Sequence, residues 1–129
     1  MSPLDVVCAV IQRNGKILAA KRRPGGPTGG KWEFPGGKVK NGETPEQAVC
    51  REVAEELGCT VAPLSRLKPN LHEYPQFSVL LLPIICELES GEPNALEHVE
   101  IKWLQADELP RLDWSDADEP ILSQLPCHR

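Results

Sequence analysis

Three glutamates, Glu52, Glu55 and Glu56, lie within five positions of the segment GGKVKNGETPEQAVCREVAEELGC, which spans residues 36–59. Like charges this close repel one another and weaken a helix. They also suit a hard divalent cation, because Mg²⁺ takes oxygen ligands and commonly bridges carboxylates to substrate phosphates. An ordinary solvated helix face is the alternative, but such a face mixes charges, and here Arg51 is the only cation of the expected helix. The pattern therefore favours a divalent metal site.

The glutamates lie on a helix predicted over residues 44–57. An N-cap, a proline at the first helical position, a capping-box glutamine and a terminal glycine mark its ends, at Thr44, Pro45, Gln47 and Gly58. At about 100° per residue, the stripe expected to pack on a sheet consists of Val49, Val53 and Leu57, with Cys50 and Ala54 beside them. The glutamates fall on roughly the other side, near the negative end of the helix dipole, where carboxylates are disfavoured. A bound cation would compensate for this charge.

The rest of the chain is predicted to form mainly strands. Residues 4–12 and 16–22 are apolar runs joined by RNGK, whose Asn-Gly pair indicates a β-hairpin. A glycine-rich loop follows, RPGGPTGGKWEFPGG, with a short extended piece at residues 32–34. Further elements are expected as strands at 60–64, 66–73, 77–88 and 100–104 and a second helix at 116–125. Since strands outnumber helices, the helices should cover a central sheet.

Composition limits the classes of ligand. The 129 residues form one expected domain, 1–129, with a net charge of −5 and a pI near 5.2, which argues against stable nucleic-acid binding. An anionic ligand would need a cation to bridge it to this acidic chain. Lys21, Arg22 and Arg23 form a basic run that fits either a local anion contact or a solvated strand end. The N-terminus has neither a basic region nor a long apolar run, so we expect no signal peptide and no membrane anchor.

The cysteines indicate a reducing compartment. Their number is odd, no CxxC pair occurs, and they are Cys8, Cys50, Cys59, Cys86 and Cys127. Buried free thiols fit this arrangement better than a disulfide framework does. We therefore expect a cytoplasmic protein. A monomer or weak dimer is expected as well.

The region around the glutamates resembles the signature box of the Nudix hydrolases. The chain reads glycine, five residues, glutamate, seven residues, Arg-Glu-Val, one residue, Glu-Glu, one residue and Gly-Cys, from Gly37 through Glu43 to Cys59. Cys59 stands where a larger aliphatic residue is usual, a difference that concerns packing. The opening hairpin, WEFPGGKV, EHVEIKWL and DWSDADEPI are similar to the MutT-type branch, which hydrolyses nucleoside triphosphates. This resemblance implies an α+β fold, an α/β/α sandwich with a mixed central sheet flanked by helices.

The resemblance also implies roles for the residues of the box. Metal ligands would be Glu52, Glu55, Glu56 and the backbone carbonyl of Gly37, holding Mg²⁺, with Mn²⁺ as a substitute. Arg51 would orient the carboxylates through its planar fork, and Glu43 would support the metal site. A later glutamate of the branch acts as ligand or base; Glu97 matches it, and Glu100 competes for the role. An exposed loop charge is the alternative for Glu97.

The substrate contacts implied by the resemblance are less specific. Lys38 and Arg22 match phosphate-contacting positions, with solvated or structural roles as the alternatives. Phe34 or Trp32 would line the base pocket, although large aromatics at strand ends are usually core. His72 and His98 have no partner at metal-ligand spacing and are interpreted as ordinary polar residues.

Asp118 bears on which base is bound. It stands where branch members acting on oxidised guanine nucleotide carry asparagine. An ionised aspartate only accepts hydrogen bonds, which favours the amine of cytosine or the N1–H and N2–H₂ of a guanine. Capping of the last helix is the alternative role for Asp118.

The sequence therefore predicts an enzyme that hydrolyses a nucleoside triphosphate to the monophosphate and pyrophosphate, of the 8-oxo-dGTP type. A preference for CTP, dCTP or modified cytidine nucleotides is the first alternative. A Nudix-fold module that binds nucleotide without catalysis is the alternative from another class, although every metal carboxylate of the box is present. Hydrolysis of nucleotide sugars or dinucleotides is disfavoured by the short chain.

Overall fold

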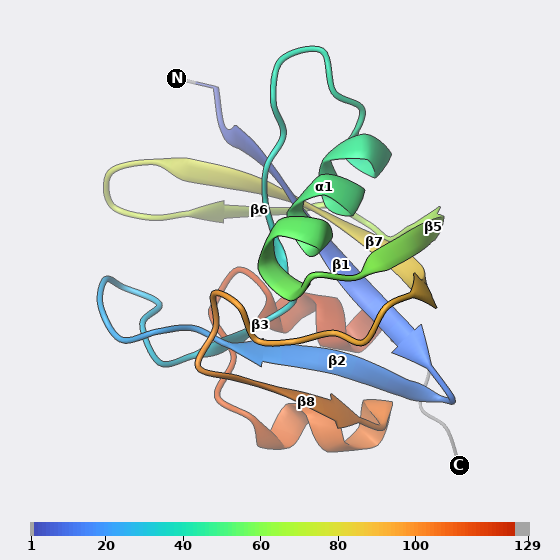
Figure 1. Cartoon of the computed structure of the whole chain (residues 1–129). Helices are drawn as coiled ribbons and strands as arrows, with labels where there is room; N and C mark the ends of the chain where they lie inside the picture. The colour runs from blue at the N-terminus through green and yellow to red at the C-terminus, as the bar shows by residue number, and fades with distance from the viewer. Residues whose placement is uncertain (1, 126–129) are drawn as a thin grey trace.

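The computed structural model describes residues 2–125, which are built around one mixed sheet (Figure 1). Its strands are β1 (Leu4–Arg13), β2 (Lys16–Lys21), β3 (Trp32–Glu33), β4 (Gly36–Lys38), β5 (Thr60–Arg66), β6 (Asn70–Glu73), β7 (Ser78–Ser90) and β8 (Glu100–Leu104). The order is β3-β2-β1-β7-β5, while β4 pairs with β1, β6 with β7 and β8 with β2. Only β1 and β7 run parallel among these pairs. The prediction of a mixed sheet with helices, an α+β fold, is confirmed.

The predicted N-terminal hairpin is present and turns through Asn14 and Gly15. Both residues have positive φ, 53° and 75°, as a two-residue hairpin turn of type I′ requires. The turn sets the pairing of Gln12 with Ile17 in β1 and β2. The hairpin thereby carries the end of β2 and the basic run after it toward the glycine-rich loop.

Side chains of β1 point alternately to the two faces of the sheet and belong to two separate hydrophobic cores. Val7, Ala9 and Ile11 face α1 (Pro45–Leu57), the one α-helix within residues 2–125. Cys8 and Val10 face the two short 3₁₀ helices, η1 (Ala106–Arg111) and η2 (Glu119–Gln124). Figure 1 shows α1 on one side of the sheet and the orange and red C-terminal turns on the other. The sheet is thus covered on both faces, as a strand buried on both sides demands.

The helix forms where its capping signals predict. The Gln47 amide donates to Thr44 Oγ1 over 3.1 Å, the Thr44 amide donates to Gln47 Oε1 over 2.9 Å, and Gly58 ends the helix at φ 70°. Its buried residues are Ala48, Val49, Val53, Glu56 and Leu57. Ala54, expected beside the apolar stripe, is exposed, and Glu56 is buried instead. The apolar face is therefore rotated toward Glu56 relative to the prediction.

Two predicted elements were wrong in extent. Residues 116–125 do not form an α-helix; only Glu119–Gln124 is helical, with i to i+3 bonds such as Ile121 amide to Asp118 carbonyl at 3.0 Å. Pro120 lacks an amide hydrogen, and the segment is too short to nucleate an α-helix. The strand expected at 66–73 is split into the end of β5 and β6, because Pro69 in the gap cannot donate to a ladder.

The described cysteines are free thiols, and Cys127 lies outside the described residues. Burial raises the pKa of the Cys86 thiol to about 12 and raises that of Cys8 as well, so both behave as small apolar side chains. Within residues 2–125 no helix is both long and apolar enough to cross a membrane.

Candidate active site

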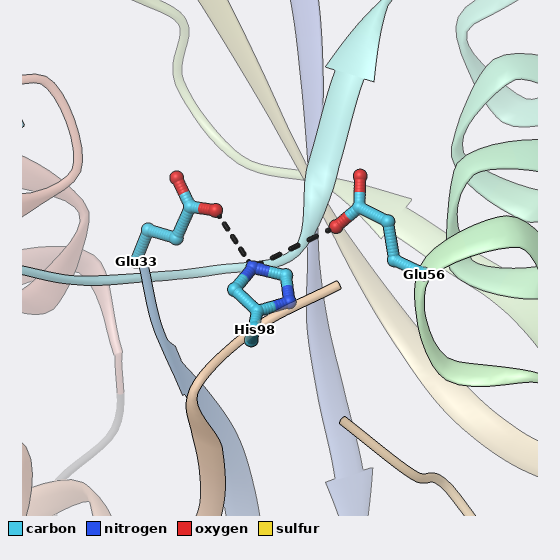
Figure 2. A group of neighbouring side chains, drawn as sticks. All are labelled: Glu33, Glu56 and His98. Carbon is cyan, nitrogen blue, oxygen red and sulfur yellow. Dashed lines mark hydrogen bonds and ion pairs between the residues drawn. The ribbon is translucent and has the colours of Figure 1, made fainter. Parts of the chain in front are cut away.

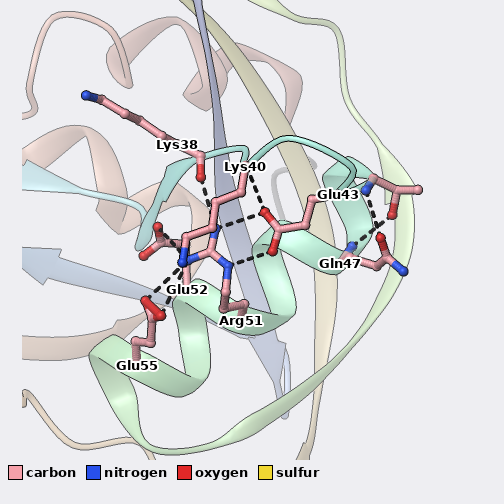
Figure 3. Close-up of polar contacts among 8 residues, drawn as sticks. Lys38, Lys40, Glu43, Gln47, Arg51, Glu52 and Glu55 are labelled. Carbon is pink, nitrogen blue, oxygen red and sulfur yellow. Dashed lines mark hydrogen bonds and ion pairs between the residues drawn. The ribbon is translucent and has the colours of Figure 1, made fainter.

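Arg51 holds the acidic segment together. Its guanidinium donates to both carboxylate oxygens of Glu43, over 2.6 Å from Nε and 3.0 Å from Nη2, and Nη2 also donates to the Lys38 carbonyl at 3.0 Å (Figure 3). Its remaining nitrogen, Nη1, lies 3.3 Å from carboxylate oxygens of both Glu52 and Glu55. One planar fork thus joins the loop before the helix to two of the three clustered glutamates.

The Arg51 contact also fixes the charge of Glu43. The hydrogen bond from Arg51, supported by one from the Lys40 amide at 2.9 Å, lowers the pKa of Glu43 to about 2. The hydrogen bond from the Lys40 amide to the Glu43 carboxylate also closes the turn between residues 40 and 43, just before the helix N-cap. Glu43 therefore remains ionised and acts as the anchor of the loop.

Gly37 lies directly against the carboxylate of Glu52. A Cβ at Gly37 would overlap both the Cδ and the Oε2 of Glu52, so a larger residue would displace this carboxylate from its present position. Gly36 has a stricter requirement, because a Cβ there would overlap the backbone carbonyl of Val7, which cannot move aside. The glycine pair therefore lets β4 pass between β1 and α1 and brings the Gly37 backbone to the helix carboxylates.

Glu56 belongs to a buried cluster with Glu33 and His98 (Figure 2). His98 Nε2 lies 2.8 Å from Glu33 Oε2 and 3.8 Å from Glu56 Oε1. Burial, followed by the charges of Glu33, Glu52 and Glu97, raises the pKa of Glu56 to about 9. In the absence of a cation, the folded chain therefore keeps Glu56 neutral at pH 7.

The loop before β8 delivers His98 and Glu97 to this cluster. The Asn94 amide donates to the Leu57 carbonyl at 2.9 Å, and the Leu96 amide donates to the Glu56 carbonyl at 3.2 Å. At the other end, Arg23 Nε donates to the Glu97 carbonyl at 3.0 Å. The loop is thus bonded to the C-terminal end of α1 and to the basic run after β2.

Two adjoining cavities open beside these side chains. The acidic cavity, about 300 Å³, is lined by Arg22, Arg23, Pro24, Gly25, Glu33, Gly36, Glu56, Glu97 and His98. The apolar cavity, about 380 Å³, is lined by Leu4, Val6, Arg22, Pro27, Thr28, Glu33, Lys38, Tyr74, Phe77, Val79, Leu81, Ser115, Ala117 and Asp118. Arg22 and Glu33 line both, and their side chains pair at 3.0 Å. An elongated ligand could therefore extend from one cavity into the other.

Asp118 is a buried carboxyl in the wall of the apolar cavity. The Phe34 amide donates to its Oδ2 and the Ser115 hydroxyl to its Oδ1, both at 2.8 Å. Burial, and next the charge of Glu33, raise its pKa to about 7 despite these two hydrogen bonds. Its side chain makes no capping bond to the following turn, so the helix-cap alternative was wrong.

Phe34 and Trp32 are core residues. The Phe34 ring packs on Trp114 with centroids 4.7 Å apart, and both Phe34 and Trp32 are less than a tenth exposed. Neither lines the apolar cavity, whose aromatic residues are Tyr74 and Phe77. Phe34 reaches the cavity only through the amide that holds Asp118.

Comparison with known proteins shows that the chain matches the NUDIX domain over residues 1–125. The chain belongs to the Nudix family. The 8-oxo-dGTP diphosphatase of Escherichia coli is 34% identical over 126 residues, covering 97% of this chain and 98% of that protein. The CTP pyrophosphohydrolase of E. coli is 34% identical over 122 residues, covering 95% and 90%. A crystal structure of a MutT Nudix hydrolase from Burkholderia pseudomallei matches with a TM-score of 0.82 and 33% identity, covering 98% and 100% of the two chains.

The Nudix box glutamates lie close together but differ in how exposed their side chains are. The side chains of Glu52 and Glu56 are largely buried, whereas the Glu55 side chain is 48% exposed. Glu97 and its competitor Glu100 are both exposed, but Glu97 lines the acidic cavity, whereas Glu100 lies on β8, opposite Lys21. This placement favours Glu97 over Glu100 as the later glutamate of the Nudix site.

Sequence reasoning missed two residues beside the Nudix box. His98 was interpreted as an ordinary polar residue, but it is buried between two carboxylates. Glu33 was not considered, although a lone charge between Trp32 and Phe34 ahead of a glycine pair is an available signal. Strand alternation places Glu33 on the face opposite those two aromatics. Nudix hydrolases use a divalent metal, and the grouping of Glu33, Glu56 and His98 is consistent with that use.

The raised pKa of Glu56 predicts how stability depends on pH. The carboxyl ionises near its ordinary value of 4.5 when unfolded but only at about 9 when folded, so the unfolded chain binds fewer protons in between. Stability without metal should therefore fall as pH rises from about 5 to 9. In EDTA at pH 8, we expect Glu56→Gln to raise Tm by at least ~3 °C, the effect of about 1 kcal/mol in a domain of this size.

Thermal melts from pH 5 to 9 in EDTA measure this effect. Glu89→Gln is the matched control, because Glu89 is an exposed carboxylate for which no change in the pH dependence is expected. Equal Tm values for wild type and Glu56→Gln throughout this range would contradict the buried neutral state of Glu56.

Proposed function

We propose that the chain is a Mg²⁺-dependent nucleoside triphosphate pyrophosphohydrolase that sanitises the nucleotide pool, with oxidised guanine nucleotides of the 8-oxo-dGTP type as substrates. The observation that carries this proposal is the pair of adjoining cavities, one lined by the carboxylates of Glu33, Glu56 and Glu97 and the other by buried Asp118. The first suits a metal-bound phosphate chain and the second a base. The two E. coli relatives named above support a triphosphate substrate.

The residues fit a hard divalent ion. Glu52, Glu55, Glu56, Glu97 and the Gly37 carbonyl would hold Mg²⁺, or Mn²⁺ in its place, and all of them offer oxygen. Glu56 Oε1 has no hydrogen-bond partner among the described residues, although it is buried. Gly37 leaves its backbone open beside Glu52. When bound, the ion would neutralise phosphate charge and lower the pKa of the attacking water.

The protein groups of the reaction have distinct tasks. Water would attack a phosphorus atom of the triphosphate while the bridging P–O bond breaks, releasing monophosphate and pyrophosphate. Glu97 is assigned as ligand or as the base that accepts the water proton, and Glu52 and Glu55 as catalytic ligands. Arg51 acts on them by holding Glu52, Glu55 and Glu43 in place. Most of the rate enhancement in such chemistry comes from positioning and charge neutralisation.

Cations near the cavities suit the phosphate chain. Arg22 lines both cavities and Lys38 lines the apolar one. Each would contact phosphate oxygens, and Arg22 would do so by exchanging its present pairing with Glu33. The enzyme would act in the cytoplasm as a monomer or weak dimer, with neither nucleic acid nor membrane as a partner.

The base would lie in the apolar cavity with Asp118 at its polar end. Each oxygen of an ionised Asp118 has a second lone pair beyond the hydrogen bond that it already accepts, and the two can pair with the N1–H and N2–H₂ of an oxidised guanine. The second candidate is a cytidine triphosphate, favoured by the E. coli CTP pyrophosphohydrolase relative and by the pKa of about 7 of Asp118. A neutral aspartic acid can donate to cytosine N3 and accept from its amine.

Replacement of Glu55 tests the catalytic role of the box. With Mg²⁺ present, we expect pyrophosphate release from 8-oxo-dGTP and a kcat roughly 10²- to 10⁴-fold lower in Glu55→Gln, because a charged metal and water partner is removed. Glu89→Gln is the matched control. Unchanged activity of Glu55→Gln would refute the site assignment. Nucleotide binding in calorimetry without turnover of any triphosphate would instead support a non-catalytic module.

A second prediction separates the two candidates for the later glutamate. Glu97→Gln should lower kcat by at least ~10-fold, whereas Glu100→Gln should leave it within about two-fold, because only Glu97 lines the acidic cavity. Both are measured by pyrophosphate release under saturating substrate. The reverse order of effects would move the role to Glu100.

A third prediction identifies the base through pH. For 8-oxo-dGTP, kcat/KM should rise as pH passes about 7, because ionised Asp118 accepts from the guanine edge. For CTP it should fall over the same range, because the neutral acid is needed to donate to N3. Asp118→Asn should remove this pH step for both substrates, because an amide does not titrate in this range. A step near pH 7 that persists in Asp118→Asn would belong to another group.

A further inference from the structure

We propose that Glu33, Glu56 and His98 form a mixed nitrogen and oxygen metal site, which binds a borderline transition ion such as Mn²⁺, Co²⁺ or Zn²⁺ through the His98 imidazole. One ligand atom from each side chain lies within 4.8 Å of the others. The three residues come from the end of β3, from α1 and from the loop before β8 (Figure 2). The inference goes beyond the proposed hydrolysis and does not need a nucleotide.

The ligand spacing suits a single ion. Nε2 of His98 is 2.8 Å from Glu33 Oε2 and 3.8 Å from Glu56 Oε1. Nitrogen and oxygen ligands bind zinc at about 2.0–2.2 Å, which separates neighbouring ligands of one ion by roughly 3–3.6 Å. Small side-chain rotations would bring both separations into this range.

The cluster contains a buried polar atom without a partner. Glu56 Oε1 makes no hydrogen bond within the described residues, and its side chain is 10% exposed. It points toward His98, whose side chain is 5% exposed. An unsatisfied buried oxygen costs about 1–3 kcal/mol, so a ligand that satisfies it is favoured. A cation is the ligand that two carboxylates and an imidazole nitrogen accommodate together.

The donor set selects the class of ion. Imidazole suits transition metals, whereas Mg²⁺ prefers oxygen ligands alone. Glu52 and Glu55 contact Nη1 of Arg51 and offer no nitrogen ligand. Glu56 is common to both sets of ligands. Its neighbour His98 is therefore what would distinguish the binding of Mn²⁺, Co²⁺ or Zn²⁺ from that of Mg²⁺.

Access and charge also suit an ion. Glu33, Glu56 and His98 all line the acidic cavity, which gives a route from solvent. Arg22 pairs with Oε1 of Glu33 at 3.0 Å, which leaves Oε2 for the cluster. Two carboxylates and a neutral imidazole balance the charge of a divalent ion.

Electron spin echo envelope modulation of Mn²⁺ bound to the nucleotide-free protein tests this site. We expect coupling to a directly bound ¹⁴N in wild type, lost in His98→Gln and kept in His72→Gln, the matched control on β6. The Kd for Mn²⁺ should rise at least ~10-fold in His98→Gln. In wild-type protein labelled with ¹⁵N-histidine, the coupling should change to that of ¹⁵N, which requires no variant.

Two outcomes would overturn the proposal. One is a nitrogen coupling that survives in His98→Gln. The other is no nitrogen coupling in wild type, even if the Kd for Mn²⁺ is higher in His98→Gln. The last result would make His98 only a hydrogen-bonding neighbour of Glu56. None of these measurements involves a nucleotide. Failure here is therefore distinguishable from failure of the proposed hydrolysis, which is judged by pyrophosphate release with Mg²⁺ and Glu55→Gln.

Discussion

The guanidinium of Arg51 is the contact on which the acidic region depends. Without it, Glu43, Glu52 and Glu55 would repel one another, and the loop before α1 would lack its anchor. The bidentate bond to Glu43 and the bond to the Lys38 carbonyl hold that loop to the helix. A lysine could supply the charge but not the planar fork, so it could not hold both partners in this geometry. Charge clustering is tolerated because one cation is shared among several carboxylates.

The glycine pair and the hairpin bring distant segments to this region. Gly36 and Gly37 let β4 fit between β1 and the helix, which places the Gly37 backbone beside Glu52. Pairing of β2 with β3 and with β8 brings Glu33 and the Glu97 loop to the same edge. Arg22, at the end of this arrangement, lines both cavities. The sheet therefore aligns a charged compartment with an apolar one along a single ligand path.

Local signals predicted the helix and the first hairpin, because capping residues and the Asn-Gly turn act within a few positions. The box carboxylates were found for the same reason: their spacing is helical. The neighbours of Glu56 were not found, since Glu33 and His98 reach it only through strand pairing between remote segments. A helical arc also does not reveal which of its edges touches the sheet, so the burial of Glu56 was missed. At the C-terminal end, Pro120 and a short segment produced a 3₁₀ turn where an α-helix was predicted over residues 116–125.

Two backbone amides of the loop before β8, which bond to the C-terminal end of α1, bear on how this region unfolds locally. Asn94 and Leu96 donate to the carbonyls of Leu57 and Glu56, the last residues of α1. These carbonyls have no partner within the helix, so the loop completes the hydrogen bonding of the helix terminus. Unfolding of the loop would therefore expose the helix end and separate Glu97 and His98 from Glu56 in one event. From these two bonds we expect the acidic cavity and the last turn of α1 to open together, so that their amides share one rate of solvent exchange.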